Sequence, residues 1–235
     1  MKNPWSEFTE NVNTENLILR QEQDVISEFN QIVEDKYKIH TNIMPAPFMG
    51  DVKKSPVMIL ALNPGYDIEE EKRGFYSKYS DYWSKEIQHK FDKKTPLFCL
   101  DDEYYQYSNY WADVLKPIIS ELGDKGKEIV AKKVSKVQLF PYQSTKYKAI
   151  QKSILKKNGF DKYLPSQLYS FQLVKNAIDR DALIVIPRAV KKWEEAVPEL
   201  KGYKNKCTTN NYLNITLSQK NLGSDFNKLI EKLKQ

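Results

Sequence analysis

The clearest pattern along the chain is a series of short runs rich in apolar residues, separated by longer segments with helical spacing. The runs lie at 57–62, 136–140, 182–186 and 212–217. Runs of this length, bounded by turn-forming residues, are typical of strands buried on both faces of a sheet. We therefore predict four strands, and the length and turn-forming flanks of the 57–62 run suit a buried central strand.

Between these runs, apolar residues recur three or four positions apart. This spacing predicts amphipathic helices over 15–38, 111–133 and 166–179, from Arg188 to about Glu195, and after Ser224, which could cap the last helix. Strands that alternate with helices indicate a parallel sheet covered on both faces. The expected fold is α/β: a three-layer α/β/α sandwich with a central four-stranded, mainly parallel sheet, built as one domain over 1–235.

Residues 66–110 differ in composition from the rest of the chain. Charged residues and tyrosines dominate there, and the whole sequence contains 15 Tyr, 10 Phe and 4 Trp. We interpret this stretch as a tyrosine-rich insertion of loops and short helices laid over the carboxyl end of the sheet. Most of these rings should pack in the core, although aromatic rings also stack on unpaired bases.

Charge and rare residues narrow the function classes. The net charge of +6 is mild and fits either a protein that meets phosphate backbones or a lysine-rich protein with no polyanionic partner. Two cysteines and two histidines are too few for a Cys-rich or His-rich metal centre, and we expect Cys99 and Cys207 to be buried thiols. The N-terminus has no apolar leader, and no run approaches the ~20 apolar residues of a membrane span. We expect a cytoplasmic protein.

In parallel sheets, ligands bind outside the carboxyl ends of the strands. The residues to inspect are therefore 63–67, 140–145, 187–188 and 218–223. The first of these segments begins Asn63-Pro64-Gly65. An asparagine amide can orient a water molecule, proline fixes a turn, and glycine lets a ligand approach the backbone closely. Asn-Pro-Gly is also a common turn, so composition alone leaves a purely structural role open.

The same segment resembles a known family. Ala61-Leu62-Asn63-Pro64-Gly65 is similar to the Gly-Ile-Asn-Pro-Gly first motif of the mismatch-specific branch of the uracil-DNA glycosylase superfamily. Leu139-Phe140-Pro141-Tyr142 is similar to the superfamily's middle strand, and Ile186-Pro187-Arg188-Ala189 resembles its strand-to-helix turn. The resemblance spans roughly residues 44–234, and the first motif is its specific part.

This resemblance implies a DNA glycosylase, a hydrolase that flips a uracil, mismatched or modified base out of DNA and cleaves its N-glycosidic bond. Asn63 would position the attacking water, and Ser218 would assist catalysis. The implied base pocket consists of Leu62, Pro64, Gly65, Tyr66 and a stacking ring at Phe98, with Phe75 behind it. The implied DNA contacts are Arg188, Gln219, Lys220 and Asn221. The partner would be single- or double-stranded DNA, with no metal, no cofactor and a monomeric protein.

One departure from the family keeps other functions open. The family's second motif is His-Pro-Ser, whereas Leu217-Ser218-Gln219 contains no histidine. Either Ser218, Gln219 or Lys220 stabilises the leaving base, or catalysis on uracil is poor. One alternative is a weak or inactive glycosylase-fold protein that only binds nucleic acid. The other is an S-adenosylmethionine-dependent amino-methyltransferase, whose Asn-Pro-Pro-Tyr motif Asn63-Pro64-Gly65-Tyr66 approaches, but only one glycine, in Phe48-Met49-Gly50-Asp51, could serve its cofactor loop.

Overall fold

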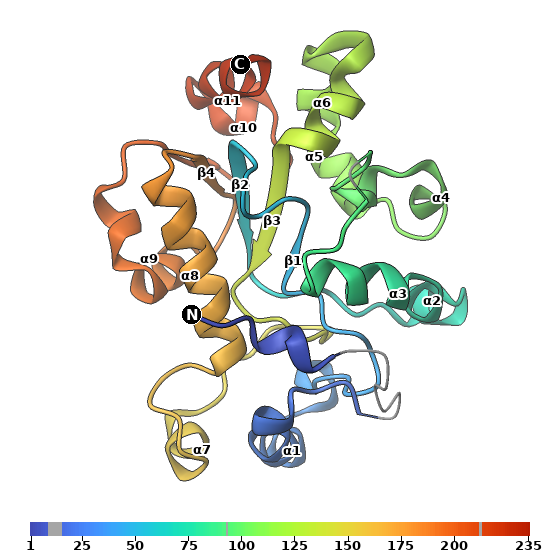
Figure 1. The fold of residues 1–235 in the computed structure, drawn as a ribbon, viewed down its shortest axis with the longest axis vertical. Coiled ribbons are helices and arrows are strands. Elements are labelled where there is room, and N and C mark those ends of the chain that lie inside the picture. The colour runs from blue at the N-terminus through green and yellow to red at the C-terminus, as the bar shows by residue number, and fades with distance from the viewer. Residues whose placement is uncertain (9–15, 93, 212) are drawn as a thin grey trace. The chain divides into compact units, whose positions relative to one another are not determined.

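The computed structural model describes residues 1–8, 16–92, 94–211 and 213–235 (Figure 1). These residues group into two compact units. The first unit comprises Met1–Pro47, Leu62–Lys90 and Gln138–Gln172. The second unit comprises Phe48–Ala61, Phe91–Val137 and Leu173–Gln235. Each unit is assembled from three separate chain segments. The prediction of one domain over 1–235 remains a prediction.

The sheet belongs to the second unit, apart from Gln138 at the end of β3. Its strands are β1 (Phe48–Met49), β2 (Val57–Ala61), β3 (Val134–Gln138), β4 (Leu183–Ile186) and β5 (Lys206–Thr208), in the order β1-β3-β2-β4-β5. β4 pairs in parallel with both β2 and β5, whereas β1 pairs antiparallel with β3. Every residue of β2, β3 and β4 is buried. The α/β class is therefore confirmed, with a five-stranded mixed sheet.

The prediction of four strands is wrong in two respects. Residues 213–217 form no strand, and Tyr212 lies outside the described residues. Leu213 is 79% exposed, and the side chain of Asn214 accepts a hydrogen bond from the Thr216 backbone, so local side-chain bonds replace the sheet ladder. The sheet instead gains β5 and the short β1, both of which were missed.

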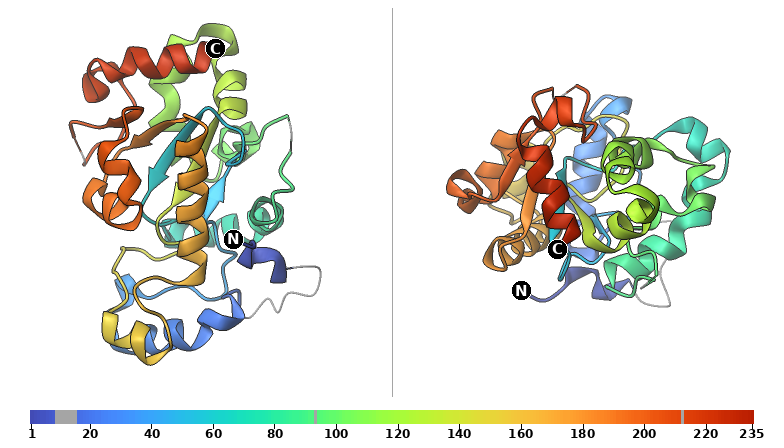
Figure 2. Two further views of the ribbon diagram at one scale, coloured as in Figure 1. Left: turned by 60° about the vertical axis from the view of Figure 1, so that its left-hand side comes forward. Right: turned by 90° about the horizontal axis from the view of Figure 1, so that it is seen from above.

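The second unit also contains helical segments. They are η4 (Phe98–Leu100), α4 (Asp102–Tyr105), α5 (Tyr110–Glu121), η5 (Gly123–Lys125), α6 (Gly126–Lys133), α9 (Val190–Ala196), η6 (Pro198–Gly202), α10 (Gln219–Leu222) and α11 (Asp225–Lys234). The Trp193 indole of α9 is fully buried and donates to the Ala61 carbonyl at the end of β2, 3.1 Å away. α10 and α11 lie side by side (Figure 2), and the predicted apolar stripe of α11 is buried.

Two predicted helices differ in extent. The 111–133 helix is interrupted between α5 and α6, because Gly123 takes a left-handed φ of 72° there. The 15–38 helix is reduced to η2 (Arg20–Glu22), α1 (Gln23–Ile32) and η3 (Asp35–Tyr37), and residue 15 lies outside the described residues.

The first unit also contains η1 (Pro4–Glu7), α2 (Ile68–Lys72), α3 (Phe75–Ile87) and α7 (Lys152–Lys157). α8 (Pro165–Asp179) begins in the first unit and ends in the second. α3 is a regular helix of 13 residues within the predicted insertion. Its side chains Phe75, Tyr76, Tyr79 and Trp83 are buried. Much of the aromatic content of the insertion therefore supplies core volume, as predicted for most of these rings.

A buried carboxyl joins three segments of the first unit. Glu22 is fully buried and accepts hydrogen bonds from the Tyr142 hydroxyl at 2.6 Å, the Ser166 backbone N–H at 2.7 Å and the Ser166 hydroxyl at 2.9 Å. Burial raises the pKa of the Glu22 carboxyl to about 7, although these hydrogen bonds act to lower it. Tyr142 is itself fully buried, so its hydrogen bond to Glu22 anchors the loop that carries it.

Within the described residues, no helix is both long enough and apolar enough to cross a membrane. Cys99 and Cys207 are buried thiols, as predicted.

Candidate functional site

The candidate site is built where the segment after β2 runs beside the segment after β3. Leu62 accepts a hydrogen bond from the Phe140 N–H at 2.9 Å, and Gly65 and Ser144 form an isolated parallel bridge. The Tyr66 N–H donates to the Ser144 carbonyl at 3.2 Å. Backbone pairing thus continues past the strands into these two loops, and it fixes the residues between them.

The Asn63 side chain is held at one end only. Its Nδ2 donates to the Pro64 carbonyl at 3.0 Å and to the Ser144 hydroxyl at 3.0 Å. A carbonyl can only accept, so the nitrogen of the amide must face it. The oxygen Oδ1 then points the other way, and it has no hydrogen-bond partner in the part of the chain that the structure describes. Asn63 therefore presents a fixed acceptor from a half-buried position.

Ser144 links this amide to the next turn of its own loop. Its buried hydroxyl accepts from Asn63 and donates to the Lys146 carbonyl at 3.1 Å. A hydroxyl has one proton, so donating it to the carbonyl leaves the oxygen lone pairs for the amide. The result is a directed chain of two hydrogen bonds from Asn63 to residue 146.

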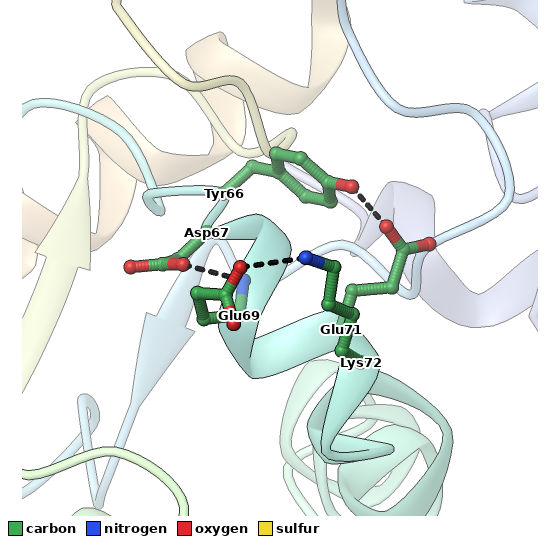
Figure 3. A network of polar contacts seen from close by, with 5 residues as sticks. All are labelled: Tyr66, Asp67, Glu69, Glu71 and Lys72. Carbon is green, nitrogen blue, oxygen red and sulfur yellow. Dashed lines mark hydrogen bonds and ion pairs between the residues drawn. The ribbon is translucent and has the colours of Figure 1, made fainter.

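An aromatic stack stands beside Asn63. The Tyr66 ring lies 3.5 Å from the His40 ring, centroid to centroid, with 18° between the planes. It also stacks on Tyr76 at 5.6 Å and 13°. Figure 3 shows the Tyr66 hydroxyl donating to Glu71, while Asp67 caps α2 through the Glu69 N–H. Because the Tyr66 ring already stacks on two neighbours, a base would meet this stack at an end or an edge rather than on Tyr66 itself.

The protonation states follow from this packing. Partial burial lowers the pKa of His40, and the opposing field of Glu71 is the smaller effect, so the imidazole is neutral at pH 7. Desolvation, helped by the hydrogen bond to Glu71, raises the pKa of Tyr66 to about 12. Tyr66 thus stays protonated as a donor to Glu71, and His40 contributes an uncharged ring.

Gly65 leaves open space at this loop. A Cβ placed on it would meet no atom within 4 Å in the described structure, and its backbone is not in the left-handed region. Leu62 and Pro64 are half-buried beside it. The fold does not require glycine at position 65, which is consistent with the expected close approach of a ligand.

The other predicted site residues lie in the second unit. Ser218 caps α10 by accepting from the Asn221 N–H, Gln219 and Lys220 are exposed, and Arg188 donates to the Tyr110 hydroxyl at 2.8 Å. The structure brings Leu62, Asn63, Pro64, Gly65 and Tyr66 together in the first unit.

Two assignments do not survive this placement. Phe98 is 4% exposed, and Tyr104 packs edge-on against it with ring centroids 5.3 Å apart, so it offers no free face to a base. Asn221 is 7% exposed, and its amide is used entirely within its own loop, donating to Asn214 and Thr216 and accepting from Asn211. Phe98 is therefore a core residue, and Asn221 stabilises the 211–216 loop through its hydrogen bonds.

The sequence pattern assigned neither histidine to the site. His89 forms a hydrogen bond with the Tyr169 hydroxyl at 2.7 Å, whereas His40 stacks on the Tyr66 ring, three residues after Asn63. Its backbone N–H donates to the Gln143 carbonyl at 3.0 Å, which brings it there. Ser144 was missed as an individual residue, although it falls in the strand-end segment 140–145.

Among the described residues, no group of three or more His, Cys, Asp or Glu side chains could hold a metal ion. Comparison of the chain with family models, with curated proteins and with solved structures gives no match.

Proposed function

We propose that the chain is a DNA N-glycosylase that hydrolyses the bond between deoxyribose and a uracil, mismatched or modified base, with Asn63 orienting the attacking water. The observation that supports this proposal best is the one-sided anchoring of the Asn63 amide. Its nitrogen is bound to Pro64 and Ser144, while none of the described residues donates a hydrogen bond to Oδ1. The resemblance of Leu62-Asn63-Pro64-Gly65 to the mismatch-specific glycosylase motif adds independent support.

The chemistry suits a neutral acceptor. As the C1′–N bond breaks, its electron pair leaves with the base and positive charge develops on the sugar. Oδ1 accepts a hydrogen bond from water, aims the water oxygen at C1′ and places a fixed partial negative charge near the sugar, which needs no reorganisation during the reaction. An amide cannot take up the water's proton at neutral pH, so that proton passes to the departing base or to solvent. This proposal requires neither a metal nor an organic cofactor.

The base must leave the helix before any of these groups can reach it, at a cost of a few kcal/mol. Leu62, Pro64, Gly65 and Tyr66 would line the pocket that receives it, and His40 at the end of the aromatic stack is the added candidate for contact with the base. Gln219, Lys220 and Arg188 remain proposed DNA contacts, and the assisting role of Ser218 in catalysis stays a prediction. The proposal further includes a three-layer sandwich, a monomeric protein and a cytoplasmic setting.

The test is base release from oligonucleotides that carry uracil, mismatched or modified bases, measured as abasic sites cleaved by alkali. We expect product from at least one of them, and we expect Asn63→Ala to reduce its rate by about 100-fold or more, the size of effect seen when one preorganised polar group is removed. Asn42→Ala is the matched control, because Asn42 is an exposed asparagine of the same unit.

Two outcomes would overturn this proposal. One is Asn63→Ala with full activity, because the assigned mechanism would then be wrong. The other is no abasic product from any substrate combined with a thermal shift on adding S-adenosylmethionine, which would favour the methyltransferase alternative.

A further inference from the structure

A lysine-bearing ribbon lies next to the candidate site in the first unit. It consists of residues 34–40 and 144–148, which we call the lysine ribbon. The His40 N–H donates to the Gln143 carbonyl at 3.0 Å, and the Lys146 N–H donates to the Lys36 carbonyl at 2.7 Å. These two backbone bonds hold the segments side by side although about a hundred residues separate them in the sequence.

The ribbon carries an excess of positive charge. The ribbon contains four lysines and two acidic residues, and His40 is neutral, so its net charge is +2. The lysines are Lys36, Lys38, Lys146 and Lys148, and the acidic residues are Glu34 and Asp35. Lys36 pairs with Glu34 at 2.6 Å and Lys38 with Asp35 at 2.8 Å. The ammonium groups of Lys146 and Lys148 have no ion-pair partner within the described residues, and both side chains are exposed.

An aromatic ring sits among these lysines. The ammonium groups of Lys36 and Lys148 lie 4.9 and 5.0 Å from the centroid of the Tyr37 ring. The fields of Lys148 and Lys146 also help to lower the pKa of Glu34, after the larger effects of its hydrogen bond and ion pair with Lys36. Two of the four ammonium groups, one from each segment of the ribbon, therefore lie over the same half-buried tyrosine.

The ribbon is tied directly to the proposed reaction centre. Ser144 accepts from Asn63 and donates to the Lys146 carbonyl, so a single hydroxyl links the amide to the backbone of Lys146. At the other segment, His40 stacks on Tyr66, three residues after Asn63. A polyanion bound along Lys146 and Lys148 would thus be held in register with Asn63.

We propose that the lysine ribbon binds the phosphate backbone of the DNA strand from which the base is removed, with Lys146 and Lys148 as the principal phosphate contacts. This inference rests on the proposed function and extends it to a surface that sequence reasoning did not identify. A lysine that forms no ion pair with an acidic side chain can neutralise a phosphate, and this releases counterions that were condensed on the DNA. Phosphate contacts set the position of a protein on nucleic acid without reading its sequence.

The test compares two double variants with equal charge change. Lys146→Gln with Lys148→Gln removes the two unpaired ammonium groups of the ribbon. Lys152→Gln with Lys156→Gln removes two exposed lysines of α7 in the same unit and serves as the control. Binding is measured by fluorescence anisotropy on an unmodified single strand of about 15 nucleotides, across about 50 to 200 mM salt. Anionic phosphatidylserine vesicles form a parallel arm.

We expect the ribbon variant to weaken binding about tenfold, and to reduce the slope of log affinity against log salt by about 1.4, which is about 0.7 for each phosphate contact on a single strand. The α7 control should change neither value appreciably. Equal losses in both variants, no loss in the ribbon variant, or binding to vesicles but not to DNA would each overturn the inference.

This readout separates the two proposals, because binding to an unmodified strand requires no base release. If the ribbon variant loses DNA binding while no substrate yields abasic product, the inference stands and the proposed glycosylase activity fails. If abasic product forms at the same rate and with the same DNA affinity in the ribbon variant, the activity stands and the inference fails.

Discussion

Two Asn-x-Gly segments of this chain, Asn63-Pro64-Gly65 and Asn221-Leu222-Gly223, are used in opposite ways. At Asn221, both ends of the amide are bonded, because Nδ2 donates to Asn214 at 2.6 Å and to Thr216 at 2.9 Å while Oδ1 accepts from Asn211 at 2.8 Å. At Asn63, only Nδ2 is bonded within the described structure. The Asn221 amide is fully used in hydrogen bonds within the fold, whereas the Asn63 amide keeps an acceptor for a ligand.

The glycines differ in the same sense. Gly223 has a φ of 59°, in the left-handed region that disfavours side chains, and it ends α10. Gly65 has an ordinary backbone and open space where a Cβ would stand. Since the fold demands neither Gly65 nor the oxygen of Asn63, a reason for both residues has to be sought outside the folded chain. This contrast is the basis for assigning function to one segment and structure to the other.

The largest expected effect on stability concerns the buried Glu22 carboxyl, which anchors the loop that pairs with the Asn63 segment. Tyr142, two residues before Ser144, donates to the buried carboxyl of Glu22, whose pKa rises from 4.5 to about 7 on folding. Between these pH values the folded state holds a proton that the unfolded state has released. The stability from this group is complete below pH 4.5 and is lost as pH rises through 7, a change of about 3 kcal/mol in the free energy of unfolding.

Urea unfolding at about pH 5 and about pH 8 measures this change. In Glu22→Gln the neutral amide does not titrate, so the difference between the wild-type and variant pH dependences isolates the carboxyl. Identical pH dependences would show that Glu22 is not the source. The hydrogen-bond partners of the Asn221 side chain are all uncharged, so the cost of altering that loop should not change over the same pH range.

The next effect is the cost of Asn221→Ala. Removing this amide leaves one N–H and two carbonyls of the 211–216 loop without their partner, which should lower the free energy of unfolding by about 1 to 3 kcal/mol. Base release measured well below the unfolding transition should stay within about twofold of wild type, since the folded enzyme keeps Asn63. A large loss of activity at unchanged stability would reverse the roles assigned to the two asparagines.

The contrast between these segments also shows what sequence alone can reach. β2 and β4 were predictable because each is a continuous apolar run, fully buried in the sheet. β3 is equally buried but contains Ser135, Lys136 and Gln138, and it begins two residues before the predicted 136–140 strand. β1 and β5 have two and three residues and no periodicity to detect. The apolar residues of 213–217 indicated a strand, but Asn211 and Asn214 bond the local backbone instead.

The candidate site divides in the same way. Asn63 was predictable from its position at the end of an apolar run, and its environment was not. Ser144 lies 81 positions away along the chain and is brought to the amide by pairing of the two loops. His40 reaches Tyr66 from a segment that carries no strand or helix pattern. Contacts of this kind depend on tertiary pairing, for which a local pattern in one sequence holds no signal.

The smallest stability effect gives the sharpest test of the comparison, because it pairs the two glycines. Gly223→Ala forces a side chain into the left-handed region and should cost about 1 kcal/mol of stability. Gly65→Ala meets no neighbour within 4 Å and should change the free energy of unfolding by less than about 0.5 kcal/mol. If a nucleotide passes close to the Gly65 backbone, the added methyl group should nevertheless lower base release by about tenfold, a loss of about 1.4 kcal/mol in transition-state binding. Urea unfolding and single-turnover base release on both variants decide the matter. Full activity in Gly65→Ala would mean that the substrate does not approach this loop, whereas a loss of stability as large as that of Gly223→Ala would mean that the fold requires this glycine after all.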